Sequence, residues 1–143
     1  MSQVTAAQSC PCGQLDQARR PLTYAHCCGR YLDDFAGMAA PDAESLMRSR
    51  YSAFVLERAD YLLATWHVSH RPQTIEFDAR VKWLGLEVRK HRLLDASHAE
   101  VEFVARQKAP GTAAVRLHER SRFVKGGTAP GRWYYVDGDL LSS

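Results

Sequence analysis

Apolar residues recur with a helical period just after residue 41. From Ala43 to about Leu56, one helical face collects the apolar side chains Leu46, Met47, Tyr51, Phe54 and Val55. Asp42 is a suitable N-cap, and Glu44 lies near the positive end of the helix dipole. The pattern therefore predicts a helix that begins after Asp42. A second, shorter helix is expected from about Ala59 to Thr65, with three buried side chains, Leu62, Leu63 and Trp66.

Beyond Pro72 the pattern becomes that of strands. Four segments are predicted as strands, at about 81–89, 100–107, 113–125 and 132–137. The connections at 109–112 and 126–131 are rich in Gly and Pro and carry no helical pattern, so the strands should pair antiparallel in sequence order. Two helices followed by a curved four-stranded antiparallel sheet predict an α+β roll over residues 41–143.

Residues 1–40 lack any apolar periodicity and are rich in Gln, Gly, Pro and Arg. A segment of about 40 residues rarely buries a sufficient core unless a metal or a disulfide holds it. All of the cysteines of the chain lie in this segment, in two close pairs, Cys10 with Cys12 and Cys27 with Cys28. In a reducing compartment, metal ligation is favoured over disulfides. We therefore expect residues 1–40 to form a small metal-binding module.

Four thiolates in two pairs suit a tetrahedral Zn²⁺ site with no open position. Such a closed site is structural or partner-binding and not catalytic. His26 could substitute as a ligand, and iron could occupy the same thiolates. A redox role for the cysteines and inert structural thiols are the other interpretations.

Composition and charge narrow the function classes. The chain of 143 residues is 45% hydrophobic and 24% charged, as in globular domains, and its net charge of +3 is too small to argue for nucleic acid by itself. No apolar run approaches the roughly 18 residues of a membrane span. Met1 to Ser9 lack the basic and apolar regions of a secretory signal. We expect a cytoplasmic protein with no membrane partner.

The segments Cys10-Pro-Cys12-Gly13 and Cys27-Cys28-Gly29 resemble the SEC-C motif, the zinc-binding tail of the preprotein translocase motor SecA. Further sequence segments extend the resemblance to the YchJ family of bacterial SEC-C proteins, over essentially residues 10–140. These segments are residues 43–54, 60–63, 65–66, 83–87, 101–105, 118–123 and 132–138. This resemblance implies one zinc ion on the four cysteines and a domain of the nuclear transport factor 2-like, or cystatin-like, fold.

Two departures from the SEC-C pattern lie in the cysteine segment. Gln14 replaces the usual serine after Gly13, and the gap before Cys27 is longer than usual, with Arg19-Arg20-Pro21 inside it. Closing a longer loop costs little extra entropy, so ligation should survive.

Folds of this kind can leave a conical pocket between the sheet and the helix. Helical steps of 100° place Arg50 inside the apolar arc, and strand alternation places Glu119 on the inward face of the third predicted strand. We expect Arg50 and Glu119 to form an ion pair; the pocket candidates are Arg50, Tyr51, Trp66, Glu119 and Tyr135. The alternatives are a ligand-binding pair and a catalytic base on Glu119.

The opposite face of that strand carries a basic row of Arg116, His118, Arg120 and Arg122. This row could dock an acidic partner or RNA phosphates. The alternative is a solvated sheet face, balanced by acidic neighbours such as Glu100 and Glu102 on the adjacent strand.

No nucleophile elbow, P-loop or dinucleotide fingerprint is present in the sequence. We therefore expect a non-catalytic adaptor that binds a macromolecular protein partner through its zinc module. By resemblance to the SecA tail, that partner belongs to the protein-export or translation machinery, such as the ribosome. Two alternatives stay open: an isomerase, dehydratase or ligand-binding protein that uses the roll pocket, and a thiol-based metal-handling or redox protein.

Overall fold

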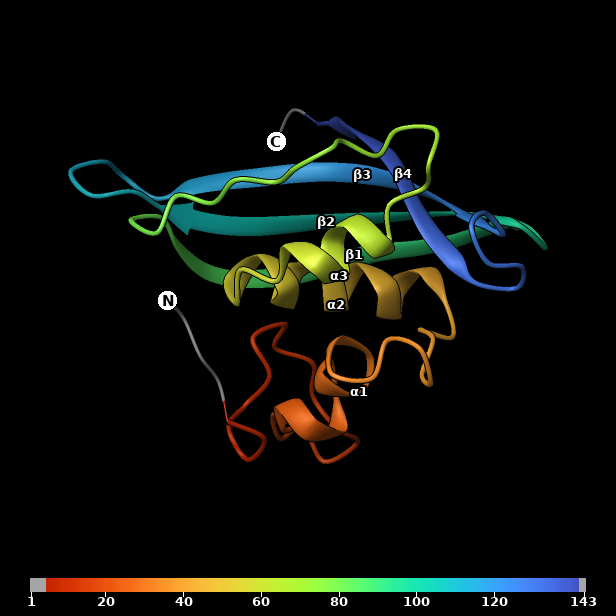
Figure 1. Ribbon diagram of the computed structural model, residues 1–143. Helices are drawn as coiled ribbons and strands as arrows, with labels where there is room; N and C mark the ends of the chain where they lie inside the picture. Colours follow the sequence, from red (N-terminus) through yellow and green to blue (C-terminus); the bar gives the residue numbers. More distant parts are fainter. Residues whose placement is uncertain (1–4, 142–143) are drawn as a thin grey trace.

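The computed structural model describes residues 5–141 and has two helices packed on one face of an antiparallel sheet (Figure 1). The helices are α2 (Ala43–Val55) and α3 (Ala59–Ala64), and the strands are β1 (Lys82–Asp95), β2 (His98–Lys108), β3 (Val115–Lys125) and β4 (Trp133–Leu140). Each strand pairs with the next in the order β1-β2-β3-β4. The predicted α+β roll is confirmed.

Local sequence signals account for the start of α2. The carboxylate of Asp42 accepts a hydrogen bond from the backbone amide of Ser45 at 2.7 Å, so Asp42 is the N-cap as predicted. Leu46 and Tyr51, on the predicted apolar face, are buried. On α3, Leu62 is fully buried.

The first strand of the sheet is longer than the sequence pattern predicts, and it is bent. β1 continues to Asp95, because its backbone stays paired with β2 as far as the tight turn before His98. Three irregularities interrupt this pairing, between Trp83 and Gly85, between residues 88 and 90, and between residues 93 and 95. Bulges of this kind bend a strand and increase its twist, so β1 curves around the helices.

The N-terminal segment lies on the side of α2 that faces away from the sheet (Figure 1). It contains a 3₁₀ helix, η1 (Tyr24–His26), and one turn of helix, α1 (Gly29–Leu32), neither of which was predicted. α2 is therefore covered on both sides, by the sheet and by the cysteine segment.

The connection between the cysteine segment and α2 is packed against the roll. The Phe35 ring meets the Tyr61 ring edge-on, with centroids 6.0 Å apart, and the Arg132 guanidinium lies 3.9 Å from the Phe35 ring centroid. Arg58 donates hydrogen bonds to the Leu32 carbonyl at 2.9 Å and to Asp33 Oδ1 at 3.1 Å. The division into residues 1–40 and 41–143 stays a prediction, since one buried core spans both parts.

Candidate functional site

Four cysteine side chains converge between the N-terminal segment and α2. The sulfur atoms of Cys10, Cys12, Cys27 and Cys28 all lie within 4.8 Å of one another, and each residue is at most 5% exposed. A tetrahedral metal with thiolates about 2.3 Å away needs sulfurs about 3.8 Å apart. The cluster is thus close to the size of a four-thiolate metal site, and it contains all four predicted ligands.

A short hairpin positions the first cysteine pair. The amide of Cys10 donates to the carbonyl of Leu22 at 2.9 Å, and the amide of Leu22 donates to the carbonyl of Gln14 at 3.0 Å. At the tip, the Asp16 carboxylate accepts from the amides of Ala18 and Arg20, at 2.8 and 3.0 Å. The extra residues between the cysteine pairs therefore lengthen a closed hairpin and leave its base intact.

The second pair lies at the corner between η1 and α1. The amide of Cys27 donates to the Tyr24 carbonyl at 3.1 Å. A Cβ on Gly29 would lie 2.6 Å from that same carbonyl oxygen and 2.8 Å from two Tyr24 ring carbons, so only glycine fits beside the pair. Gly13, after the first pair, has φ +75° and serves the turn. The two glycines thus serve different purposes.

The chemistry of the donor set fits a metal ion. Hydrogen bonds from Cys12, and then from Cys27 and Cys28, hold the pKa of the Cys10 thiol far below its usual value. Hydrogen bonds with Cys10 and then Cys12 raise the pKa values of Cys27 and Cys28 instead. Without a metal, Cys10 is therefore the thiolate and Cys27 and Cys28 keep their protons. A cation would stabilise all four as thiolates.

The cluster is closed on the side of α2. Cys10 Sγ lies 3.6 Å from Ser52 Oγ, and Arg48 Nη1 donates to the carbonyl of Cys12 at 3.4 Å. Ser52 is fully buried. His26, the alternative ligand, is exposed and bonds Thr23 through Nδ1 at 2.9 Å, so it does not join the cluster.

The predicted pocket residues meet elsewhere, on the sheet side of α2. Arg50, Tyr51, Trp66, Glu119 and Tyr135 all line one cavity of about 210 Å³ between α2 and the concave face of the sheet. Its remaining walls are largely apolar. The sequence therefore placed Arg50 and Glu119 on the correct faces of α2 and β3.

The predicted ion pair between Arg50 and Glu119 does not form. Arg50 uses Nη1 to reach the Leu62 carbonyl at 2.8 Å and Thr65 Oγ1 at 2.7 Å, both at the end of α3. Its guanidinium carbon lies 4.4 Å from the Tyr135 ring centroid. Burial lowers the pKa of Arg50 to about 10, so the side chain stays charged at neutral pH.

Glu119 is held on the opposite wall. Its Oε2 accepts a hydrogen bond from Ser121 Oγ at 2.7 Å. Gly138 on β4 leaves space for this carboxylate, because a Cβ there would lie 2.8 Å from Glu119 Oε2. The two charged groups of the cavity therefore have separate partners.

Comparisons with known proteins agree with this architecture. Residues 42–138 match the family model described as YchJ, middle NTF2-like domain. A UPF0225 protein of Polaromonas sp. (strain JS666) is 75% identical over 130 residues, which span 91% of each chain. The chain belongs to the YchJ family. A UPF0225 protein of Bordetella pertussis is 54% identical over 132 residues, covering 92% of both chains.

Two solved structures extend the YchJ-family similarity to the cysteine segment. The crystal structure of a SEC-C motif containing protein from Psychrobacter arcticus has a TM-score of 0.77 and 35% identity, covering 96% of this chain and 85% of that one. The solution structure of a SEC-C motif containing protein from Rhodopseudomonas palustris has a TM-score of 0.75 and 33% identity, covering 94% and 100%. Over residues 5–141, no helix has the length and apolarity needed to span a bilayer.

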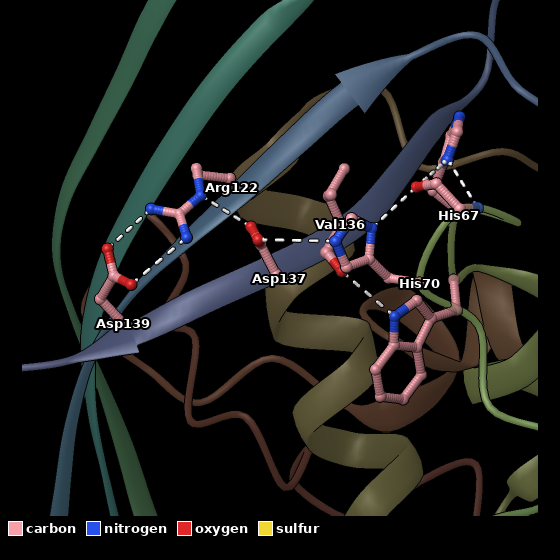
Figure 2. Close-up of polar contacts among 8 residues, drawn as sticks. His67, His70, Arg122, Val136, Asp137 and Asp139 are labelled. Carbon is pink, nitrogen blue, oxygen red and sulfur yellow. Dashed lines mark hydrogen bonds and ion pairs between the residues drawn. The ribbon is translucent and has the colours of Figure 1, made fainter.

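The basic row of this YchJ-family chain is partly paired with acids on the outer sheet face. Figure 2 shows Arg122 between Asp137 and Asp139, with a nitrogen-to-oxygen distance of 2.7 Å to each. His118 Nε2 lies 2.9 Å from Glu102 Oε2 on β2. These pairs match the balanced, solvated face that the sequence offered as an alternative to a docking row.

Ser52 and Arg48 are the contacts from α2 to the cysteine cluster, and sequence reasoning missed both. They lie four residues apart and therefore share one face of α2, away from the apolar arc that includes Leu46. Ser52 is fully buried on that face, so this side of α2 has a packing partner of its own. The sequence could not show that this partner is the cysteine segment.

Proposed function

We propose that the four cysteines hold one zinc ion in a closed structural site, and that the protein is a non-catalytic adaptor. The observation that carries this proposal is the burial of all four sulfurs, at 0–5% exposure. Four thiolates complete the coordination of Zn²⁺, and burial leaves no approach for water or a substrate. The ion would organise the N-terminal segment on α2. The thiols suit a reducing compartment, which supports a cytoplasmic location.

Metal analysis tests the zinc site. Untagged protein purified from defined medium should contain one zinc per chain, and the variant Cys27→Ser/Cys28→Ser should contain none. Electronic absorption separates zinc, which is colourless with thiolates, from iron, which is not. Absence of metal, or cysteines found oxidised in pairs by mass spectrometry, would refute the proposal in favour of thiol redox chemistry. Cys12 and Cys27, with sulfurs 3.5 Å apart, are the pair to inspect.

The hairpin between the cysteine pairs is the surface that we assign to a macromolecular partner. Leu15 on this hairpin is 51% exposed, and Arg19 and Arg20 at its tip are exposed and form no ion pair within the described residues. The similarity to the SecA tail supports a protein of the export or translation machinery as the partner. The exposed arginines favour an acidic surface on it. Contact with the ribosome or RNA through Arg116 and Arg120 stays a separate prediction.

Crosslinking in cells tests this surface. A photoreactive amino acid at Leu15 should give discrete protein adducts, and the changes Arg19→Glu and Arg20→Glu should remove them. The same probe at Leu93, exposed on β1, is the matched control and should give none of these adducts. Equal adducts from both positions, or adducts that survive the charge reversal, would exclude the hairpin as the docking surface.

A further inference from the structure

The cavity between α2 and the sheet contains an arginine with unused hydrogen-bond donors. Arg50 is only 5% exposed, and both of its hydrogen bonds come from Nη1. Nε and Nη2 bond no residue between 5 and 141, and Arg50 lines the cavity, so both donors are left for a group bound there. These two nitrogens form one edge of the guanidinium, which is the geometry that binds both oxygens of a carboxylate.

Within the described residues, the positive charge of the buried Arg50 guanidinium is only partly balanced by negative charge. The Leu62 carbonyl at the end of α3 and the ring of Tyr135 offer partial negative charge, and Glu119 does not pair with Arg50. Burying a charge without a full counter-charge is costly. An anion in the cavity would therefore gain a preorganised, desolvated partner.

The rest of the cavity indicates the size and character of a ligand. Its volume of about 210 Å³ is below the roughly 300–1,000 Å³ of sites for drug-sized molecules, so the ligand is metabolite-sized. Aromatic and aliphatic side chains form most of the wall, including Phe103, Leu117 and Phe123. An apolar body of compact shape fits such walls.

A second polar group faces the same space. Glu119 lines the cavity, and the hydrogen bond from Ser121 occupies only Oε2. Oε1 accepts no hydrogen bond from any residue between 5 and 141, so it can accept one from a ligand. The cavity therefore offers donors from Arg50 and an acceptor from Glu119, with apolar walls between them.

We propose that this cavity binds a small carboxylic acid with a compact apolar body and a hydroxyl or ammonium group. The carboxylate bonds Nε and Nη2 of Arg50, and the hydroxyl or ammonium group donates to Glu119. This binding requires no part of the cysteine cluster, which lies on the other side of α2. It is therefore independent of the adaptor role proposed above.

Three probes on one scaffold test the proposal. 4-Hydroxyphenylacetate carries both polar groups, phenylacetate lacks the hydroxyl, and 2-(4-hydroxyphenyl)ethanol lacks the carboxylate. Trp66 and Trp83 line the cavity, so their fluorescence reports occupancy. The first probe should bind most tightly, and each probe that lacks one polar group should bind about tenfold more weakly or worse. Absence of saturable binding by all three at millimolar concentration would overturn the proposal.

Substitutions test whether Arg50 causes the preference for the carboxylate and Glu119 the preference for the hydroxyl. Arg50→Met should abolish the preference for the carboxylate, and Glu119→Gln should reduce only the preference for the hydroxyl. Ala105→Leu fills the cavity without removing a charge and should abolish binding even if Arg50→Met folds poorly. Arg116→Gln on the outer face is the control and should bind as the wild type does. A carboxylate preference that survives Arg50→Met would show that Arg50 only anchors α3.

Discussion

Replacement of Gly29 by alanine should loosen the cysteine cluster without altering any cysteine. The added Cβ would lie 2.6 Å from the Tyr24 carbonyl oxygen and 2.8 Å from two carbons of the Tyr24 ring. Ordinary contacts of this type begin at 3.4 Å, so about 0.8 Å of movement is required. Tyr24 is itself buried and donates a hydrogen bond to Asp33, so it has little room to yield.

The displacement therefore falls on the turn that carries Cys27 and Cys28. Overpacking of a filled core typically costs about 1–3 kcal/mol, and we expect Gly29→Ala to lower the free energy of unfolding by that amount. Metal–ligand distances tolerate only about 0.2 Å, which is well below the required movement. Metal retention should therefore fall together with stability.

Urea unfolding and the rate of metal transfer to a chromogenic chelator measure the two effects. Gly13→Ala is the matched control, because Gly13 has φ +75° and nothing within 4 Å of the added Cβ. That change should cost about 1–2 kcal/mol of backbone strain, with a smaller change in the transfer rate than in Gly29→Ala. If Gly29→Ala unfolds within about 0.5 kcal/mol of the wild type and keeps its metal, close packing at Tyr24 does not hold the cluster.

Three further changes test other parts of the structure. Arg58→Ala removes two hydrogen bonds to the N-terminal segment, one of them to Asp33, and should cost about 1 kcal/mol in urea unfolding because the side chain is a third exposed. Leu62→Ala empties a fully buried position and should cost about 2–5 kcal/mol. The hydrogen bond from His118 holds the pKa of Glu102 below its ordinary 4.5, so this contribution is present above pH 4.5 and lost below it. Glu102→Gln should therefore flatten the loss of stability below pH 4.5.

Each of these changes has a counterpart in a different environment. Arg80→Ala removes an exposed pair with Asp78 and should have little effect on unfolding. Leu93→Ala, at 65% exposure, should cost much less than the core truncation. Glu76→Gln, at an exposed position with no ion pair among residues 5–141, is the control for Glu102→Gln. Equal effects within any pair would contradict the contacts on which that prediction rests.

Features set by local sequence were predictable, and features set by distant contacts were not. The N-cap at Asp42 and the apolar stripe of α2 depend on neighbours a few residues away. The end of β1 depends on backbone pairing with β2, which continues through the polar residues 89–92, so the predicted strand ended six residues too early. Periodicity also shows which face of its element carries Arg50 or Glu119, but not which hydrogen-bond partners each side chain finds. The prediction of an ion pair between them was therefore wrong.

The cysteine cluster was predictable because all of its members lie in one short segment of the sequence. Cysteines are confined to one short segment, and their chemistry leaves few alternatives in a reducing compartment. The second half of the site, Ser52 and Arg48 on α2, depends on how that segment packs on the roll. No spacing within the cysteine segment encodes this packing.

The closed base of the hairpin has a consequence for how this chain can change. Backbone hydrogen bonds between Cys10, Gln14 and Leu22 fix the cysteine end, whereas the tip at Arg19 adopts φ +62° in an exposed turn. Residues can therefore be gained or lost at the tip during evolution without changing the ligand geometry. The same position suits an engineered epitope or reporter peptide, since an insertion there extends into solvent and leaves the buried core intact.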